Sequence, residues 1–279
     1  MLIIFVGLDR AGKSSIKIYL ETLDVEKAKN TKMSNGLEVY KVGDTFKIEV
    51  FPGQEKLRYN EKLYQVFFPP ADKIFFIFDA ADKKRFNEVT KYFRYIEEMI
   101  NKYCNKKIEV ILVAHKQDIE GAIKAKTFFE KHIKTTTINK ISFLDTSIYD
   151  PFSLSNLLKK IHGTKIDNIV EALRRLCRAE LAFLYDGHIL PISYSPAKPN
   201  NNIITHINQI LIAFEKIDKI EAFAGYFKTK NIAAIAIYEK DSRIIIGVYG
   251  FKLSLRDTLN YCKQAGQKYI SEYRDQMWG

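Results

Sequence analysis

An eight-residue segment near the start of the chain constrains the fold more than any other feature. Residues Gly7–Ser14 read GLDRAGKS and fit GxxxxGK[ST], a phosphate-binding loop when it joins a strand to a helix. Both neighbours fit, because Leu2–Val6 is a short apolar run and Ser14–Leu23 has a helical pattern. The glycines allow a tight turn whose N–H groups converge on phosphate oxygens, and the helix N-terminus adds its dipole. The sequence therefore predicts a nucleotide-binding α/β domain.

The residues of this loop have expected roles. Lys13, one of two predicted catalytic residues, is expected to reach the β- and γ-phosphates. Ser14 is a predicted ligand of Mg²⁺, a cation that prefers hydroxyl, phosphate and water oxygens. Arg10 invites comparison with an arginine that neutralises transition-state charge, but a solvent-facing loop position is the favoured interpretation. The predicted nucleotide contacts of this segment are Gly7, Asp9, Arg10, Ala11, Gly12, Lys13, Ser14 and Ser15.

A polar segment further along predicts which base is bound. Residues 115–118 (HKQD) follow the apolar run Glu109–Ala114 and fit [N/T/H]KxD. Asp118 is expected to accept hydrogen bonds from N1–H and the exocyclic amine of guanine, a donor pair that adenine lacks. Lys116 is expected to cover one face of the base. The predicted base contacts are His115, Lys116, Asp118, Ser147 and Ile148, the last through its N–H to the guanine oxygen.

The segment FPGQ at residues 51–54 lies between these motifs and is a candidate sensor of the γ-phosphate. Gly53 would offer a backbone N–H from a hinge, and Gln54, the second predicted catalytic residue, would orient the attacking water. Thr31, in the polar stretch Lys27–Asn35, is the second predicted Mg²⁺ ligand and is expected to close on the γ-phosphate. Loss of that phosphate would then release both segments.

Buried runs alternate with helical patterns over residues 1–163, which predicts a mostly parallel sheet with helices on both faces. Two strand-like runs meet at Gly43-Asp44, a hairpin signal. Such a sheet binds ligands at the carboxyl ends of its strands, where the motifs above stand. The other expected elements are strands at Leu37–Val42, Phe46–Phe51, Lys73–Phe78 and Ile141–Leu144, and helices at Arg85–Asn101 and Ser153–His162.

Gly163-Thr164 interrupts this rhythm and predicts a boundary between domains at residues 1–163 and 164–279. The second domain is predicted to be a smaller α+β domain, an antiparallel sheet sandwiched by helices. Asp186-Gly187 predicts a hairpin turn, and Pro191 assigns its strand to a sheet edge. The expected elements are a helix at Ile166–Cys177, strands at Leu181–Tyr185 and His188–Ser193, a loop at Ser195–Asn202, a helix at Ile203–Ile217, strands at Glu221–Phe227, Ile232–Glu239 and Ile244–Tyr249, and a helix at Leu255–Tyr273.

Composition excludes several classes of protein. The net charge of +11 has no block of like charge, so a solvated surface is expected and nucleic acid is not an expected partner. No apolar run approaches the ~18 residues that span a bilayer, and Leu2–Val6 is too short for a secretory signal, so a cytoplasmic protein is expected. The three cysteines and five histidines have no metal-ligand spacing, which predicts reduced thiols and no structural metal site.

Taken together, the motifs resemble the Rag/Gtr small GTPases, and their C/D branch more closely than their A/B branch. The matching segments are GLDRAGKSS at 7–15, FPGQ at 51–54, HKQD at 115–118 and TSIYD at 146–150. The His in place of the usual Asn at position 115 and the TSIYD string are the most diagnostic, and GLD at 7–9 also resembles Arf-like GTPases. AELAFLYDG at 179–187 is similar to the start of the C-terminal roadblock (longin-related) domain of that family.

This resemblance implies a P-loop GTPase fold followed by a roadblock/longin-like dimerisation domain at residues 164–279. It implies GTP or GDP and Mg²⁺ as ligands. The implied partners are a second GTPase subunit or a second copy of this chain, GTPase-activating and exchange factors, and an endomembrane-associated complex. It therefore adds peripheral attachment to a membrane, through partners, to the expected cytoplasmic location.

One position departs from the family pattern. The DxxG motif of the family begins with an aspartate that holds Mg²⁺ through water, and this chain has Val50 there, while Glu49 in a strand would point to the other face. The departure predicts weak Mg²⁺ retention and slow hydrolysis that a partner stimulates. Two rival functions stay open: a scaffold that binds nucleotide without hydrolysing it, and an ATP-dependent kinase, which has no use for Asp118 or Ile148. A third, an assembly platform, is compatible with the switch.

Overall fold

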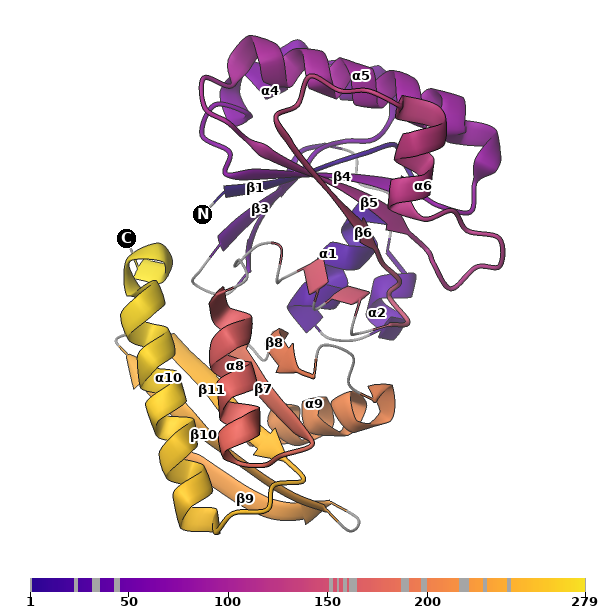
Figure 1. The fold of residues 1–279 in the computed structure, drawn as a ribbon. Helices are drawn as coiled ribbons and strands as arrows, with labels where there is room; N and C mark the ends of the chain where they lie inside the picture. The colour runs from indigo at the N-terminus through magenta and orange to yellow at the C-terminus, as the bar shows by residue number, and fades with distance from the viewer. Residues whose placement is uncertain are drawn as a thin grey trace. The chain divides into compact units, whose positions relative to one another are not determined.

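The computed structural model describes residues 2–22, 25–31, 36–42, 46–150, 153–154, 156–157, 160, 165–186, 191–196, 200–215, 221–227, 230–239 and 242–278. The chain divides into two compact units, Met1–Leu154 and Ser155–Gly279, each built on its own sheet (Figure 1). The predicted boundary at Gly163-Thr164 lies outside the described residues. The division into domains at 1–163 and 164–279 therefore stays a prediction.

A six-stranded sheet organises the first unit, in the order β2-β3-β1-β4-β5-β6. All neighbouring strands are parallel except β2 and β3, which are antiparallel. The mostly parallel sheet and the pairing of the first hairpin are confirmed, although the turn at Gly43-Asp44 lies outside the described residues. The strands are β1 (Leu2–Val6), β2 (Glu38–Val42), β3 (Phe46–Val50), β4 (Lys73–Asp79), β5 (Glu109–His115) and β6 (Lys140–Asp145).

Helices cover both faces of this sheet, as predicted (Figure 1). On one face lie α1 (Lys13–Thr22) and α2 (Val25–Lys29), and on the other lie α4 (Glu61–Phe67), α5 (Phe86–Tyr103) and α6 (Ala125–Phe128). Strand side chains alternate between the two faces, so Ile74, Phe76 and Phe78 of β4 share a core with α5. The ring centroids of Phe76 and Phe93 are 5.2 Å apart in this core.

The short helices of the first unit were not predicted. The helix α2 begins before the stretch read as a polar loop and ends inside it at Lys29. Its one buried residue, Ala28, stands between two lysines and gives no apolar pattern. Half of the helix predicted at Ser153–His162 lies outside the described residues. The other unpredicted helices are α3 (Glu55–Arg58), α4, η1 (Lys83–Arg85), α6 and η2 (Phe129–Ile133), each too short to show a clear hydrophobic period.

A five-stranded antiparallel sheet organises the second unit, in the order β8-β7-β11-β10-β9. The antiparallel sheet is confirmed, and so is the edge position of the strand with Pro191. The residues expected to begin that strand, 188–190, and Gly187 of the predicted turn lie outside the described residues. The elements are α8 (Lys165–Leu176), β7 (Leu181–Asp186), β8 (Pro191–Ser195), α9 (Asn201–Glu215), β9 (Ala222–Phe227), β10 (Lys230–Glu239), β11 (Ser242–Tyr249) and α10 (Leu255–Trp278).

Helices also cover both faces of the second sheet. Ala182 and Leu184 share a buried core with residues of α8 and α10 on one face. The neighbouring Tyr185 points to the other face, where its hydroxyl donates to Asn208 Oδ1 of α9 at 2.5 Å. The predicted sandwich of helices around an antiparallel sheet is therefore confirmed. The cysteines Cys104, Cys177 and Cys262 are free thiols, as expected.

Candidate nucleotide-binding site

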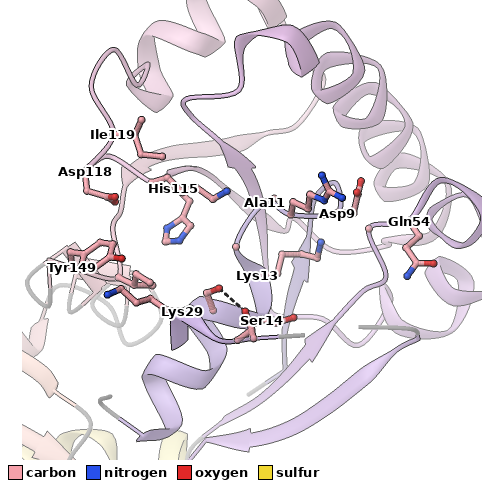
Figure 2. Close-up of a pocket in the computed structure, with 17 residues that line it drawn as sticks. Asp9, Ala11, Lys13, Ser14, Lys29, Gln54, His115, Asp118, Ile119 and Tyr149 are labelled. Carbon is pink, nitrogen blue, oxygen red and sulfur yellow. Dashed lines mark hydrogen bonds between the residues drawn. The ribbon is translucent and has the colours of Figure 1, made fainter. Parts of the chain in front are cut away.

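One cavity of about 670 Å³ collects the predicted motifs at the carboxyl ends of the parallel strands (Figure 2). Gly7 and Ser147 are the predicted contacts that do not line it, whereas Lys29, Ile119 and Tyr149 line it without having been predicted. The lining residues are Asp9, Arg10, Ala11, Gly12, Lys13, Ser14, Ser15, Lys29, Thr31, Gly53, Gln54, His115, Lys116, Asp118, Ile119, Ile148 and Tyr149.

Two glycines give the phosphate loop its shape. Gly7 has φ +149°, and a Cβ there would lie 1.9 Å from the carbonyl oxygen of Ile77 on β4. Gly12 has φ +91°, and a Cβ there would lie 2.2 Å from Cδ2 of His115. Both positions therefore require glycine, for backbone conformation and for space. The second contact also shows that the phosphate loop packs directly on the HKQD segment.

Lys13 is buried within the loop that it is expected to serve. Its Nζ donates to the carbonyl oxygens of Gly7 at 2.8 Å and Leu8 at 2.7 Å. Burial lowers the pKa of Lys13 to about 7, while the nearby Asp9 carboxylate acts in the opposite direction. A bound phosphate would favour the charged ammonium, because its negative charge offsets the loss of hydration that burial causes.

The opposite end of the cavity holds the predicted base contacts, with Asp118, Ile119 and Tyr149 gathered there in Figure 2. The Oγ of Ser147 donates to Asp118 Oδ1, which explains why Ser147 acts behind the wall rather than in it. The Nζ of Lys116 donates to Asp79 Oδ2 at 2.5 Å, so the end of β4 orients the side chain expected to cover the base.

His115 connects the two ends. Its Nδ1 is hydrogen-bonded to Thr146 Oγ1 at 2.9 Å, and its ring lies against Gly12. Burial lowers the pKa of His115 to about 4, so the ring is neutral in the folded protein at neutral pH. The histidine thus acts as an uncharged spacer between the phosphate loop and the segment after β6, which begins at Thr146.

The buried histidine predicts a loss of stability in mild acid. The pKa of His115 is lower in the folded protein than in the unfolded chain, so protonation favours unfolding. Its full contribution is present above about pH 6.5 and declines as the pH falls toward about 4. We expect the protonation of His115 to lower the free energy of unfolding by about 2 kcal/mol between roughly pH 7 and pH 5. Urea unfolding of the wild type and His115→Asn at both pH values measures this difference; parallel pH profiles would contradict it.

The segment after β3 contacts the phosphate loop through its backbone. The N–H of Asp9 donates to the carbonyl oxygen of Gly53 at 3.0 Å. The next residue, Gln54, lines the cavity and caps α3, whose Leu57 and Arg58 N–H groups donate to its carbonyl oxygen. The predicted water-orienting residue is therefore held beside the phosphate end, as Figure 2 shows.

The predicted metal ligands have different surroundings. Both Ser14 and Thr31 line the cavity, but the hydroxyl of Thr31 is hydrogen-bonded to that of Ser15 at 3.1 Å. Val50 is fully buried and is not part of the cavity wall. In the part of the chain that the structure describes, no group of three or more His, Cys, Asp or Glu side chains could hold a metal ion.

Lys29 and Tyr149 face each other at the base end of the cavity. The Nζ of Lys29 lies 5.0 Å from the centroid of the Tyr149 ring and also donates to Glu26 at 2.8 Å. The sequence offered a signal for Tyr149, which belongs to the TSIYD string, although only Ser147 and Ile148 of that string were predicted contacts. Lys29 gave none, because one lysine in a Lys-rich stretch looks like a solvated side chain.

No helix within the described ranges combines the length and the apolar character needed to cross a membrane.

Comparison with known proteins places the chain in a family. The sequence model of the ADP-ribosylation factor (Arf) family matches residues 1–177. ADP-ribosylation factor-like protein 3 of Caenorhabditis elegans is 30% identical over 131 residues, 46% of this chain and 67% of that protein. The small COPII coat GTPase SAR1 of Giardia intestinalis is 27% identical over 128 residues, 46% of this chain and 64% of that protein. The structure of the Arl6 BBS3 small GTPase from Trypanosoma brucei with the nucleotide analogue GppNp has a TM-score of 0.47 and 19% identity, and the match covers 58% of this chain and 95% of that one. The family model covers well over half of the sequence, so this chain belongs to the ADP-ribosylation factor family of small GTP-binding proteins.

Proposed function

We propose that this Arf-family member is a guanine-nucleotide switch that binds GTP or GDP with Mg²⁺ and slowly converts GTP to GDP and phosphate. The observation that carries the proposal is the single cavity shared by the phosphate loop, the FPGQ segment, the HKQD segment and Ile148. Arf-family small GTPases are GTP hydrolases, which supports the same reaction here. A scattered set of motifs would not support this function.

Each group in the cavity has a role in this proposal. Lys13 and the loop amides hold the phosphates, and Gln54 orients water toward the γ-phosphate. Asp118 selects guanine because its carboxylate accepts from the two adjacent donors of that base, and Lys116 covers the ring. Ile148 donates its N–H to the guanine oxygen.

A competition assay tests the choice of nucleotide. Purified protein loaded with fluorescent GDP is challenged with GTP or ATP, and we expect GTP alone to displace the label at low concentration. Identification of the nucleotide that copurifies with the protein gives an independent answer. Equal or better displacement by ATP would contradict the guanine switch and favour a P-loop kinase.

The residues present fit Mg²⁺, although one oxygen ligand of the family pattern is missing. The Ser14 hydroxyl is a hard oxygen ligand in the cavity wall, and the nucleotide phosphates would supply further oxygens. Thr31 would have to exchange its bond to Ser15 to reach the cation. The side chain of Val50 offers no oxygen, so the protein would hold Mg²⁺ mainly through Ser14 and the nucleotide. The cation would neutralise phosphate charge during hydrolysis.

Val50 leads to a prediction for the kinetics. We expect intrinsic GTP hydrolysis to be slower than the roughly 3 × 10⁻⁴ s⁻¹ of Ras, because one second-sphere carboxylate near Mg²⁺ is missing. We also expect nucleotide retention to require millimolar rather than micromolar Mg²⁺. Single-turnover phosphate release and dissociation of fluorescent GDP across a Mg²⁺ titration measure both. Hydrolysis at the Ras rate in micromolar Mg²⁺ would contradict this prediction.

Val50 also favours a second candidate function, a scaffold that binds nucleotide without hydrolysing it. The two functions differ in one observable, phosphate release in the presence of a partner. Small GTPases generally interact with activating proteins and exchange factors, and a partner that accelerates release supports the switch. Nucleotide that stays intact with every such partner supports the scaffold.

For the second unit we propose a roadblock/longin-like dimerisation platform, as in the Rag/Gtr GTPases that the motifs resemble. It would pair with a second GTPase subunit or a second copy of this chain and dock regulators in an endomembrane-associated complex. The antiparallel sheet between helices supports this, as does its edge strand β9, in which Ala222 and Ala224 are exposed. Light scattering of the full chain tests self-pairing: a mass near twice 32.4 kDa supports it, and a monomer indicates a different subunit.

A further inference from the structure

Asp9 introduces a carboxylate into the phosphate end of the cavity, where Figure 2 shows it near Lys13 and Gln54. A nucleoside triphosphate is strongly anionic, so an uncompensated carboxylate there would oppose its binding. This carboxylate is compensated by Arg85, whose NH2 group donates to Asp9 Oδ1 at 2.7 Å. The NH1 group of the same guanidinium donates to the Asp9 carbonyl oxygen at 3.0 Å, so the loop backbone is held as well.

Arg85 is itself fixed from behind. Its Nε donates to Glu88 Oε2 at 2.8 Å, and the other oxygen of Glu88 accepts from Arg58 at 2.7 Å. Arg58 is 3% exposed and lies on α3, directly after the Gln54 segment. Arg58, Glu88, Arg85 and Asp9 thus form a chain of alternating charges between α3 and the phosphate loop. The two arginines lower the pKa of Glu88 to about 2, so this carboxylate stays charged at neutral pH.

The charges of Asp9 and Arg85 reach the phosphate end of the cavity. Asp9 lines the cavity together with Lys13, and the Arg85 guanidinium contacts both the carboxylate and the carbonyl oxygen of Asp9. Arg85 is not among the residues that line the cavity, so its charge acts there without a direct contact. The guanidinium therefore stands behind Asp9, where it offsets the negative charge that faces the ligand.

We propose that Arg85 is a positioning residue that holds the Asp9 carboxylate back and masks its charge, so that a phosphate loop containing an aspartate accepts a triphosphate. This inference rests on the proposed function. GTP places one more phosphate than GDP in the site, so the masking favours GTP over GDP. Arg85 thereby sets the nucleotide preference of the switch without touching the nucleotide.

The test compares affinities for GTP and GDP in the full chain. We expect Arg85→Gln to lower GTP affinity about tenfold more than GDP affinity, the scale of one interaction of roughly 1.4 kcal/mol between charges. The double variant Asp9→Asn with Arg85→Gln is expected to restore the ratio toward the wild type, because the carboxylate that needs masking is gone. Asp9→Asn alone is expected to move the ratio toward GTP, since the arginine charge is then unopposed.

Arg94→Gln is the matched control. Arg94 lies on α5, the helix that begins directly after Arg85, and pairs with Glu97 at 2.7 Å in the same i, i+3 arrangement as Arg85 and Glu88. Its other hydrogen bonds are to the carbonyl oxygens of Ile133 and Thr135 rather than to the phosphate loop. We expect this variant to lose stability without changing the ratio of affinities. Equal losses of GTP and GDP affinity in Arg85→Gln, or no rescue by Asp9→Asn, would overturn the inference. Should Arg85→Gln not fold, the shift expected for Asp9→Asn alone decides the matter. Failure of the wild type to bind either nucleotide would instead reject the proposed function.

Discussion

Asp118→Asn is expected to lower the affinity for GTP by about 10–150-fold, which corresponds to the loss of a charged hydrogen bond worth roughly 1.5–3 kcal/mol. The same change is expected to raise the affinity for xanthosine triphosphate (XTP). Xanthine has a carbonyl where guanine has its exocyclic amine, so the site must donate rather than accept at that position. Ser147 donates to Oδ1 of Asp118, and asparagine keeps that acceptor while its amide supplies the new donor. The change therefore exchanges one base for the other without removing the support behind the side chain.

Displacement of fluorescent GDP or XDP by each triphosphate measures this exchange. Asp72→Asn is a suitable control, because it removes the same charge from a side chain that pairs with Lys106 and does not line the cavity. The control is expected to keep the preference for GTP. Unchanged GTP affinity in Asp118→Asn would show that this carboxylate does not read the base.

Gly53→Ala is expected to destabilise the first unit by about 2–4 kcal/mol, which combines overpacking with a lost hydrogen bond. A Cβ at this position would lie 2.3 Å from the backbone nitrogen of Asp9 and 2.4 Å from the carbonyl carbon of Leu8. Both are backbone atoms, so no side-chain rotation relieves the clash. The two segments must separate, and the bond from the Asp9 N–H to the Gly53 carbonyl is lost.

Urea unfolding and thermal melting at a fixed nucleotide concentration measure the cost, with a fall in Tm of roughly 5–15 °C expected. Gly36→Ala provides the comparison within the same unit, since a Cβ at Gly36 would meet nothing within 4 Å. That variant is expected to be close to neutral. A Gly53→Ala protein as stable as Gly36→Ala would show that the loops separate at no cost.

Local patterns in the sequence were sufficient to predict the first sheet and most of the cavity wall. A strand, a glycine-rich turn and a helix in succession leave few alternatives, and parallel strands bring their carboxyl ends to one edge. For this reason Lys13, Gln54 and Asp118, which are far apart in the chain, line one cavity. The sandwich of the second unit followed from the order of its elements in the same way.

The remaining features depend on contacts that no local pattern encodes. Arg85 reaches Asp9 across 76 positions, and in the sequence it looked only like the start of a helix. Tyr149 and Lys29 meet because two loops converge, and neither loop has a period. Thr31 was expected beside Mg²⁺ because of its hydroxyl, yet the hydroxyl bonds to Ser15, a competing partner that spacing alone does not identify.

The close approach of the imidazole of His115 to Gly12 has an evolutionary consequence. Any side chain added at position 12 would occupy the space of the ring, and a smaller residue at position 115 would leave a void beneath the turn. Because the backbone at Gly12 also disfavours any side chain, position 12 should stay glycine among descendants of this gene, and variation should be confined to position 115.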